Sequence, residues 1–516
     1  MLERLFHTPK QMVVTVALGS VLAVLFLLIL SVREPASPSA RGGNADSGGT
    51  GGAGGFAPIA YNATPTPDPT PVGWQPPAAA APAQTHTVGP GETLGDIANR
   101  YGQSTDDFVT ANQLADPDVL DVGQVLIVPG GNQTGAAPAV SPSLKLIPDS
   151  ELVYGPTARG LDVSAFLTQR NSYLLAYSDT VEGQTLSGAD IVQLVADRFS
   201  LHPRLLLAAL EFRSHWVTQA TPSDNRYPMG LTQPGYEGLY RQLEWAANQL
   251  NRGYYGHAEG GLTQFSLNDG TAIVVAPDIN HATVGVQLWL GAHSRANYTD
   301  WQRETGPEGF AATYAALFGN PFGYTYEPIW LGQETQPALR LPWDAGAGWY
   351  FTGGPHGGYA GGSAWAALDF APPDGRTGCY ESESWLTAAA DGVVTRSGFG
   401  AVVIDLDGDG FAGAGWALHY LHVAARERVA VGASVRAGDR IGHPSCEGGV
   451  SNGTHVHFAR TYNGRWIAAD GSAPFNLSGW VSGGAGKEYD GVLQRGGVTK
   501  TACTCREEWN TLSAEP

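Results

Sequence analysis

The pattern of apolar and polar positions first separates the beginning of the chain from the rest. Residues 12–32, within QMVVTVALGSVLAVLFLLILSV, contain no charged side chain, while Arg4 and Lys10 precede them. An uninterrupted apolar run of about 20 residues matches the thickness of a bilayer core, whereas a signal-peptide core usually spans about 7–15 residues. The pattern predicts a transmembrane anchor with residues 1–11 in the cytoplasm, and a cleaved signal peptide is the alternative.

Residues 33–84 show no apolar periodicity. They begin with the Gly-rich stretch GGNADSGGTGGAGG and continue into the Pro-rich stretch NATPTPDPTPVGWQPP. Such a composition cannot bury a core and is typical of a disordered tether. We expect this linker to separate the N-terminal anchor from the folded part of the chain.

A short and regular pattern follows over residues 85–130. THTV is typical of a strand, GETLGDIANRYG places its apolar residues on one face of a helix, and GQVLIVPG is typical of a second strand. Between them, Ser104 followed by Asp107 predicts the start of another helix. The order strand, helix, helix, strand, with HTVGPGETLGDIANRYG, ANQL and LDVGQVLIVPG, resembles a LysM module over its whole length.

The LysM resemblance implies binding of a glycan that contains N-acetylglucosamine, which in bacteria is peptidoglycan. Gly91, Thr93 and Asn112 are weak candidates for glycan-binding residues, since the binding positions of the module vary. The apolar positions of the segment are also those that a domain of this size needs for its core.

After a second linker, residues 131–145, the apolar spacing becomes that of helices. Segments such as SGADIVQLVADRFS, HPRLLLAALEFRSHW and NHATVGVQLWLGAHS predict a mainly α-helical domain over residues 146–335. Pro203 stands where a helix would begin. The role of this domain stays open between a scaffold, a glycan-binding domain and a pro-region that occludes the next domain.

Glu211, in AALEFRSHW, lies near the end of an apolar helix and loosely resembles the acid of the lysozyme-like transglycosylases. A buried carboxylic acid there could act as a glycosidase acid, since apolar surroundings raise its pKa. That family usually shows Glu-Ser-Gly, whereas this chain has Glu-Phe-Arg. An ion pair of Glu211 with Arg204 or Arg213 is therefore the favoured interpretation.

From residue 336 to residue 516, short alternating segments are separated by Gly-rich turns, as in DGVVTRSGF, AVVIDLDGDG and HVHFARTYNG. This pattern predicts a mostly antiparallel β domain. The expected fold class is thus multidomain α+β, with an N-terminal transmembrane helix, a small βααβ module, a mainly α middle domain and a C-terminal antiparallel β domain.

Candidate catalytic chemistry is concentrated in this last domain. GTHVHFA places His455 and His457 on the same face of a strand, because side chains alternate along a strand. TGGPHGGYAGGSAWAALDF contains His356 and, thirteen residues later, Asp369. Catalytic zinc takes three protein ligands of these types and leaves a fourth position for water, whose pKa falls to about 7. The sequence therefore predicts a metal-dependent hydrolase.

A further histidine comes from LHYLH, where His419 and His422 are three residues apart. On a strand this spacing turns the two side chains to opposite faces, so only one can join the cleft. The alternation alone does not select between them.

Four segments in a fixed order resemble the lysostaphin-type zinc metallopeptidases: PHGGYAGGSAWAALDF, LHYLHV, SVRAGDRIGHPS and GVSNGTHVHFA. The wide His-to-Asp spacing and the cysteine ahead of the His-x-His segment are most similar to the beta-lytic, LasA-like branch. The resemblance implies a β metallopeptidase domain with a narrow groove, one catalytic Zn²⁺ and cleavage of peptide bonds in peptidoglycan. It also implies His356, Asp369 and His457 as zinc ligands, with His422 and His455 as catalytic histidines.

The net charge and the cysteine content limit the binding partners and the cellular compartment that we expect for this protein. A net charge of −19 argues against nucleic acid, because phosphate binding needs clusters of basic residues. The four cysteines fit two disulfides in an oxidising compartment, with their pairing open; they are Cys379, Cys446, Cys503 and Cys505. The expected partners are peptidoglycan and, through the N-terminal helix, a membrane.

One more segment, DLDGDGFAGAGW, begins like a calcium loop. Asp405, Asp407 and Asp409 have suitable spacing, but the twelfth position is Trp416 rather than the bidentate Glu of an EF-hand. A Gly/Asp hairpin turn is the favoured interpretation, and Ca²⁺ stays the less favoured one.

The expected protein is a bacterial cell-wall hydrolase, anchored in the envelope or secreted if its N-terminal segment is cleaved. A LysM module would target a zinc endopeptidase to the wall. Two other classes are alternatives: a catalytically silent wall-binding or regulatory protein, and a bifunctional enzyme whose helical domain cleaves glycan. The complete set of five metal-site and catalytic residues argues against the silent protein.

Overall fold

The computed structural model describes residues 85–88, 92–101, 103–112, 114, 120, 124–129, 138–222 and 224–515. All of them belong to one unit, Ala63–Pro516. The expected cytoplasmic N-terminus 1–11, anchor 12–32 and linker 33–84 lie outside the described residues, as do residues 131–137 of the second linker.

The transmembrane part of the expected fold class needs correction. Among the described residues, no helix combines the length and the apolar character needed to cross a bilayer. The longest described helix, α7 (Leu239–Ala258, 20 residues), is interrupted by Arg241, Glu244 and Arg252, whereas a spanning helix needs about 20 predominantly apolar residues. The expected transmembrane helix is therefore not found among the described residues, and segment 12–32 itself lies outside them.

The small N-terminal module has the expected βααβ order. It consists of β1 (Thr85–Thr87), α2 (Leu94–Tyr101), α3 (Thr105–Asn112) and β2 (Val125–Ile127), and the two strands pair antiparallel. Ser104 begins α3 as predicted, since its Oγ accepts the Asp107 N–H while its own N–H donates to the Asp107 carboxylate. Ile97, Phe108 and Leu126 have no exposed surface and form the centre of this core.

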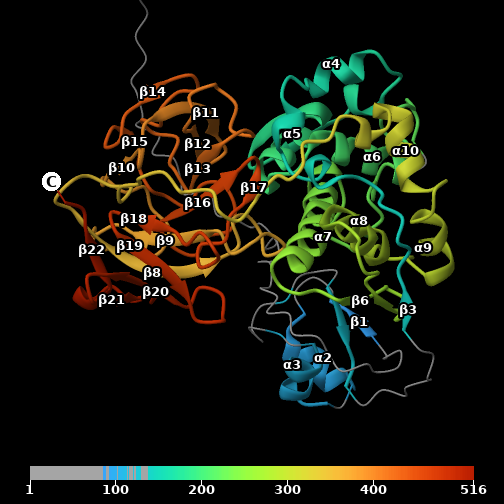
Figure 1. Ribbon diagram of the computed structural model, residues 1–516, viewed down its shortest axis with the longest axis horizontal. Helices are drawn as coiled ribbons and strands as arrows, with labels where there is room; N and C mark the ends of the chain where they lie inside the picture. Colours follow the sequence, from blue (N-terminus) through green and yellow to red (C-terminus); the bar gives the residue numbers. More distant parts are fainter. Residues whose placement is uncertain are drawn as a thin grey trace, which may run out of the picture. The chain divides into compact units, whose positions relative to one another are not determined.

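The middle region is mainly helical (Figure 1). Its helices are α4 (Val163–Thr168), α5 (Gly188–Phe199), α6 (Pro203–Ser214), α7, α8 (His281–Ala292), α9 (Tyr298–Glu304) and α10 (Phe310–Phe318). Pro203 does occupy the first turn of α6. Helices α7 and α8 cross where Gly253 faces Gly285, and a Cβ on Gly253 would lie 2.6 Å from the Gly285 Cα. Only glycine permits so close a crossing.

Short strands complete the middle region. They are β3 (Ala139–Val140), β4 (Ser178–Val181), β5 (Gln184–Ser187), β6 (Gln264–Ser266) and β7 (Ala272–Val274). Ser187, at the end of β5, caps α5 because its Oγ accepts the Asp190 N–H and its N–H donates to the Asp190 carboxylate.

The C-terminal region is built on β-sheets, as predicted (Figure 1). In the described residues its main sheet has the order β14-β11-β12-β13-β16-β9-β8-β22, with β17 paired to β16. All of these pairs are antiparallel. The strands are β8 (Gly348–His356), β9 (Ala367–Ala371), β11 (Gly392–Gly398), β12 (Ala401–Asp405), β13 (Trp416–Leu421), β14 (Ser434–Val435), β16 (Val456–Tyr462), β17 (Arg465–Trp466) and β22 (Thr511–Ser513).

Two smaller sheets support the main one. One pairs β10 (Leu386–Thr387) with β15 (Arg440–Gly442), and the other has the order β18-β19-β20-β21. The strands of the second are β18 (Asn476–Leu477), β19 (Trp480–Gly484), β20 (Gly491–Arg495) and β21 (Val498–Thr501). The core between these sheets is apolar and includes the fully buried Phe351, Phe370 and Phe458.

The β16–β17 hairpin contacts the helical region directly. Trp466 is 2 % exposed; its indole N–H donates to the Phe199 carbonyl at 3.2 Å and its backbone N–H donates to the Tyr255 hydroxyl at 2.9 Å. The Ser200 hydroxyl donates to the Gly464 carbonyl at 2.7 Å. The two regions therefore share part of one apolar core, in which Trp466 packs with residues of the helices.

Candidate metal centre and catalytic residues

Three neighbouring strands of the main sheet carry the predicted metal ligands. Asp369 on β9 and His457 on β16 are direct cross-strand partners. His356 ends β8, and the pairing of β8 with β9 shifts on both sides of Gly353. Such bulges change the direction in which a side chain points. They explain how the His356 side chain reaches residues with which regular strand pairing would not align it.

The ligand atoms of these three residues converge. The His356 Nε2 lies 2.9 Å from the His457 Nδ1, and the Asp369 Oδ1 lies 3.3 Å from the former and 3.4 Å from the latter. One donor atom from each residue falls within 4.8 Å of the other two. Within the described part of the chain, the buried Asp369 Oδ1 has no hydrogen-bond donor. This arrangement fits a bound metal ion.

The outer ring nitrogens of both histidines are held by backbone carbonyls. The His356 Nδ1 donates to the Gly354 carbonyl at 2.8 Å, and the His457 Nε2 donates to the Gly358 carbonyl at 2.9 Å. A proton on the outer nitrogen leaves the lone pair of the inner nitrogen directed at the ion. The two backbone carbonyls therefore select the tautomer that a metal requires.

The charges around the three candidate ligands favour the ionised form of the Asp369 carboxylate. Burial opposes the charge of Asp369, yet His356 and His455 hold the pKa of Asp369 well below its usual range. Burial lowers the pKa of His356, but the Asp369 carboxylate outweighs it and raises that pKa to about 9. Burial also lowers the pKa of His457. A metal ion that binds to His356, Asp369 and His457 therefore displaces a proton that these three residues hold.

The two predicted catalytic histidines lie beside the ligands. The His422 and His455 rings are 4.5 Å apart, and the His455 Nε2 lies 3.6 Å from the Asp369 Oδ1. His422 follows the last residue of β13 and has a φ of 65°, an uncommon conformation for a residue with a side chain. Burial, with His455 and His457, lowers the pKa of His422 well below its usual value.

His419 takes the opposite direction, as the strand alternation predicts. Its Nε2 is 3.0 Å from the Thr461 hydroxyl, and its ring packs on Trp466 with centroids 4.7 Å apart. Of the two histidines in LHYLH, the structure therefore brings His422 to the predicted site and places His419 against the contact with the helical region.

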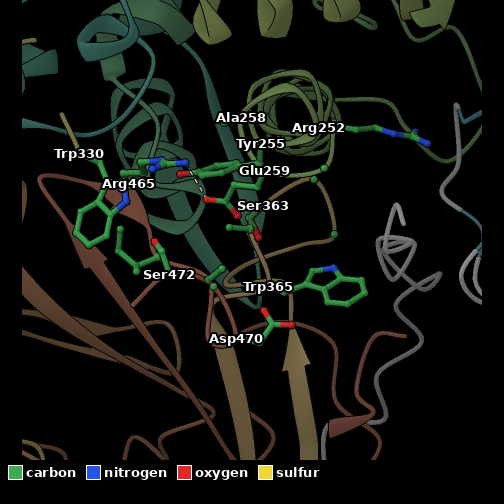
Figure 2. A pocket seen from close by; sticks show the side chains of 18 of the residues that line it. Arg252, Tyr255, Ala258, Glu259, Trp330, Ser363, Trp365, Arg465, Asp470 and Ser472 are labelled. Carbon is green, nitrogen blue, oxygen red and sulfur yellow. Dashed lines mark hydrogen bonds and ion pairs between the residues drawn. The ribbon is translucent and has the colours of Figure 1, made fainter. Parts of the chain in front are cut away.

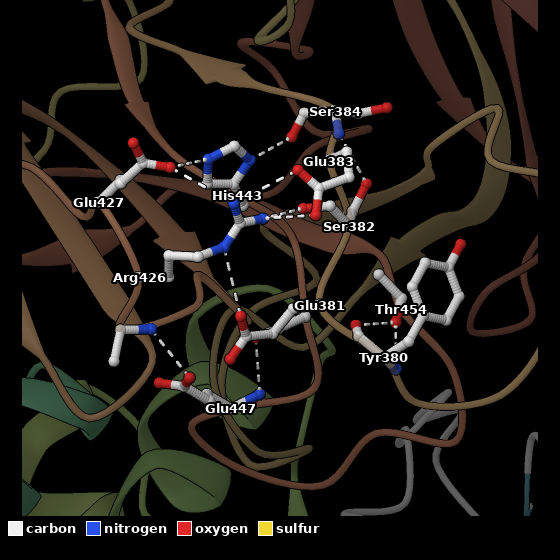
Figure 3. Close-up of polar contacts among 12 residues, drawn as sticks. Tyr380, Glu381, Ser382, Glu383, Ser384, Arg426, Glu427, His443, Glu447 and Thr454 are labelled. Atoms are coloured by element: carbon white, nitrogen blue, oxygen red, sulfur yellow. Dashed lines mark hydrogen bonds and ion pairs between the residues drawn. The ribbon is translucent and has the colours of Figure 1, made fainter. Parts of the chain in front are cut away.

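Charged side chains connect the loops that carry Glu383, Arg426 and Glu447 (Figure 3). The Glu447 carbonyl accepts the His422 Nδ1–H at 3.0 Å, while the Glu447 carboxylate accepts the Ala425 N–H at 2.8 Å. Arg426 pairs with three acidic side chains, Glu381, Glu383 and Glu427. Arg428 pairs with the Glu447 carboxylate at 3.5 Å, so contacts with Ala425 and Arg428 hold Glu447 while its carbonyl orients the His422 ring.

Several supporting residues were missed by the sequence reasoning. Tyr489 stacks on the His356 ring with centroids 4.3 Å apart, and the Glu488 carboxylate accepts the Gly357 N–H at 2.9 Å. Both lie about 130 residues after His356 and belong to no motif, so nothing in the sequence points to them. Gly354 and Gly358 lie two residues before and after His356. This closeness in the sequence was the one signal that could have identified them as supporting residues.

The cysteines form two disulfides, Cys379–Cys446 and Cys503–Cys505. The first joins the loop after β9 to the loop that carries Glu447. This resolves the pairing that the sequence left open among three connectivities.

The other candidate residues lie away from this site and make structural contacts. The Asn112 side chain bonds to the backbone of Ile127 and Phe108, and Thr93 shares a hydrogen bond with Asp96. Gly91 lies outside the described residues.

Glu211 does not form the ion pair that was favoured for it. Arg204 pairs with Glu151, and Arg213 pairs with Glu304. The Glu211 carboxylate, 9 % exposed, instead accepts the Val217 and Thr218 backbone N–H groups at 3.1 and 3.0 Å. These contacts close the turn after α6.

A separate cavity of about 630 Å³ lies where the C-terminal end of α7 meets the connection between His356 and Asp369 (Figure 2). Trp330, Trp365 and Asp470 line it, and the Arg465–Glu259 ion pair of 2.8 Å crosses its wall. None of the five histidine and aspartate residues is part of the lining, so this cavity is distinct from the metal centre.

Comparison with known families agrees with this geometry. Family models match residues 86–129 (LysM domain), residues 145–329 (LasA, N-terminal domain) and residues 366–469 (Peptidase family M23). The fold, the site and these matches define a metalloendopeptidase. More narrowly, these matches make the chain similar to the lysostaphin-type, LasA-like peptidases, with a LysM domain ahead of the peptidase match. Asp369, His422, His455 and His457 lie within the peptidase match, and His356 precedes it.

Two curated relatives are similar in sequence to parts of this chain. The protease LasA of Pseudomonas aeruginosa (strain UCBPP-PA14) is 24 % identical over 357 residues, which cover 65 % of this chain and 79 % of that protein. The beta-lytic metalloendopeptidase of Achromobacter lyticus is 28 % identical over 171 residues, 31 % of this chain and 42 % of that protein. A solved structure, the M23 metalloprotease pseudoalterin from the deep sea, is 26 % identical, with a TM-score of 0.28, and covers 35 % of this chain and 99 % of its own.

Proposed function

We propose that this protein is a zinc endopeptidase that cleaves peptide bonds of peptidoglycan. The observation that carries the proposal is the convergence of His356 Nε2, Asp369 Oδ1 and His457 Nδ1, with the outer nitrogens of both histidines already hydrogen-bonded to backbone carbonyls. Two imidazole nitrogens and one carboxylate are a ligand set that zinc takes in catalytic sites. Bound zinc would supply Lewis acidity, which polarises a peptide carbonyl and makes water reactive near neutral pH.

His422 and His455 would handle protons next to the metal ligands. His422 is held neutral by its surroundings, and its Nδ1–H is engaged by the Glu447 carbonyl, so its Nε2 is the atom left for a substrate. His455 donates its Nδ1–H to the Gly453 carbonyl at 2.7 Å, which leaves its Nε2 near the Asp369 Oδ1. The free Nε2 of such an imidazole can accept a proton from water, and the Nε2–H so formed can then donate to a developing oxyanion.

The LysM domain and the cysteines support the choice of substrate and compartment. A LysM domain would bind the glycan strands of the wall and keep the peptidase close to their peptides, which raises the local concentration of substrate. The Cys379–Cys446 disulfide is typical of an oxidising, extracytoplasmic compartment. The protein would therefore act on the cell wall from outside the cytoplasm.

The test is mass spectrometry of fragments released from purified peptidoglycan. The protein should create new amino termini, lose this activity with a chelator and regain it with one equivalent of zinc. New reducing ends or anhydro-sugars would instead indicate glycan cleavage. Full activity of the demetallated protein would refute the metal mechanism.

Variants separate the proposed roles. His457→Ala should lose both zinc and turnover, whereas His455→Ala should keep stoichiometric zinc and lose turnover. His419→Gln is the matched control, because His419 belongs to the same domain but faces Thr461 and Trp466. Loss of zinc by His455→Ala would reverse the assigned roles.

A further inference from the structure

The turn between β12 and β13 gathers three carboxylates far along the chain from the metal ligands. Asp405 ends β12, and Asp407 and Asp409 follow in the turn. One carboxylate oxygen from each lies within 4.8 Å of the other two. Gly410 has a φ of 81°, which is the sharp turn that the sixth position of a calcium loop requires of glycine.

Asp405 distinguishes this turn from an ordinary acidic loop on the surface. Its side chain has no exposed surface, unlike those of Asp407 and Asp409, which are exposed. Its Oδ2 accepts the Gly410 N–H at 2.8 Å, but its Oδ1 is buried and has no hydrogen-bond donor among the described residues. A buried carboxylate oxygen without a donor is costly unless a cation or a proton satisfies it.

We propose that the β12–β13 turn is a calcium site in which Asp405, Asp407 and Asp409 are the carboxylate ligands. The ligand set consists of oxygens only, which suits a hard cation rather than zinc. Calcium accepts six to eight oxygens in an irregular shell, and backbone carbonyls of the turn and water can complete it, whereas magnesium demands near-octahedral geometry. The hairpin turn that the sequence favoured is present, and the proposed cation binds within this turn.

Trp416 at the twelfth position limits the calcium affinity that we expect of this turn. An EF-hand supplies two further oxygens from a Glu at that position, and the indole of this chain supplies none. We therefore expect a dissociation constant of about 10⁻⁴–10⁻³ M, which is typical of extracellular calcium modules rather than of intracellular sensors.

Arg159 of the helical region competes for one of the ligands. Its guanidinium pairs with the Asp409 carboxylate and lies 4.8 Å from the centre of the Phe411 ring in the same turn. The Arg159 side chain is 47 % exposed, so the pair is solvated and weak. One cationic group beside three carboxylates leaves an excess of negative charge for a divalent ion. Calcium bound here would also stiffen the surface on which the Tyr154 and Phe411 rings meet.

The experiment is equilibrium dialysis of the full chain with radioactive calcium. The protein is first freed of adventitious metal and given one equivalent of zinc, and calcium is then varied up to about 10 mM. We expect one calcium per chain and a thermal midpoint that rises with calcium. Absence of saturable uptake by the wild-type protein would overturn the proposal and would mean that Arg159 alone balances the turn.

Two substitutions and a control locate the ion. Asp405→Asn keeps an oxygen for the Gly410 N–H and should weaken calcium binding at least tenfold, as should Asp407→Asn, whose exposed side chain makes misfolding a lesser concern. Asp391→Asn is the control, because Asp391 is also exposed in a turn and accepts one backbone N–H, from Ala437 at 2.8 Å. Unchanged binding by Asp405→Asn and Asp407→Asn, or an equal loss in the control, would overturn the assignment.

Discussion

Replacing Gly358 by alanine tests whether backbone packing holds the metal ligands in place. A Cβ at this position would lie 2.6 Å from the Trp466 Cε3, 2.7 Å from the Trp466 Cδ2 and 3.2 Å from the Ala366 Cβ. Ordinary contacts between carbon atoms begin at about 3.5 Å, so the segment or the indole has to move by about 1 Å. The indole is 2 % exposed and hydrogen-bonded at its N–H, so we expect the segment to move.

That movement affects His457 through the Gly358 carbonyl. The carbonyl accepts the His457 Nε2–H at 2.9 Å, and a shift of about 1 Å breaks this contact. Loss of such an outer partner typically weakens metal affinity about 10–100-fold, which corresponds to about 1.4–2.7 kcal/mol. Gly358→Ala should therefore show this loss, with turnover partly restored by excess zinc.

The assay is competition for zinc against a chromophoric chelator, with turnover measured in parallel. Gly398→Ala is the control, because an added Cβ there meets no atom of the described residues within 4 Å. Zinc affinity of Gly358→Ala within twofold of this control would refute the reasoning. A lowered thermal midpoint with unchanged zinc affinity would do the same, since it would show that Trp466 moves and the carbonyl does not.

Three further outcomes are expected. Trp466→Ala should lower the free energy of unfolding by about 3–5 kcal/mol in urea denaturation, because it empties a buried site between the two regions; a change below 1 kcal/mol would contradict that packing. Burial lowers the pKa of His202 to about 3, so folded His202 stays neutral while the unfolded chain gains a proton as pH falls below about 6.5, and the free energy of unfolding drops by about 2 kcal/mol between pH 7 and pH 5. His202→Gln should remove that part of the pH dependence, and an unchanged slope would exclude His202 as its source. Replacing both Cys379 and Cys446 by serine opens a loop with a sequence separation of 67 and should cost about 4 kcal/mol, measured against the wild type with and without reductant; equal stability would show that the surrounding contacts suffice.

Local patterns were enough to predict many of the helices and strands and the residue types of the candidate metal centre. Period-2 alternation identified HVHF and ALDF as strands, and it also predicted that His419 and His422 diverge. These properties depend on neighbours in the sequence, which is why a sequence alone reveals them.

Contacts across long separations could not be predicted in the same way. The pairing of Asp369 with His457 depends on which strands become neighbours and on their register, and the bulges in β8 leave no clear mark in the sequence. The support of His422 by Glu447 depends on a loop that the Cys379–Cys446 disulfide and the Arg428–Glu447 ion pair hold in place. The short strand pair β4–β5 was missed because SDTV and QTLS are mostly polar.

The cross-strand pairing of Asp369 with His457 also makes the proposed metal site depend on correct folding. A slip of one residue between β9 and β16 would turn one of the two side chains to the opposite face of the sheet, so a misregistered chain would offer no complete ligand set. Metal affinity therefore adds to the stability of the correct register alone. An enzyme that attacks the wall would gain a safeguard from this, since only correctly folded molecules could acquire the ion that makes them active.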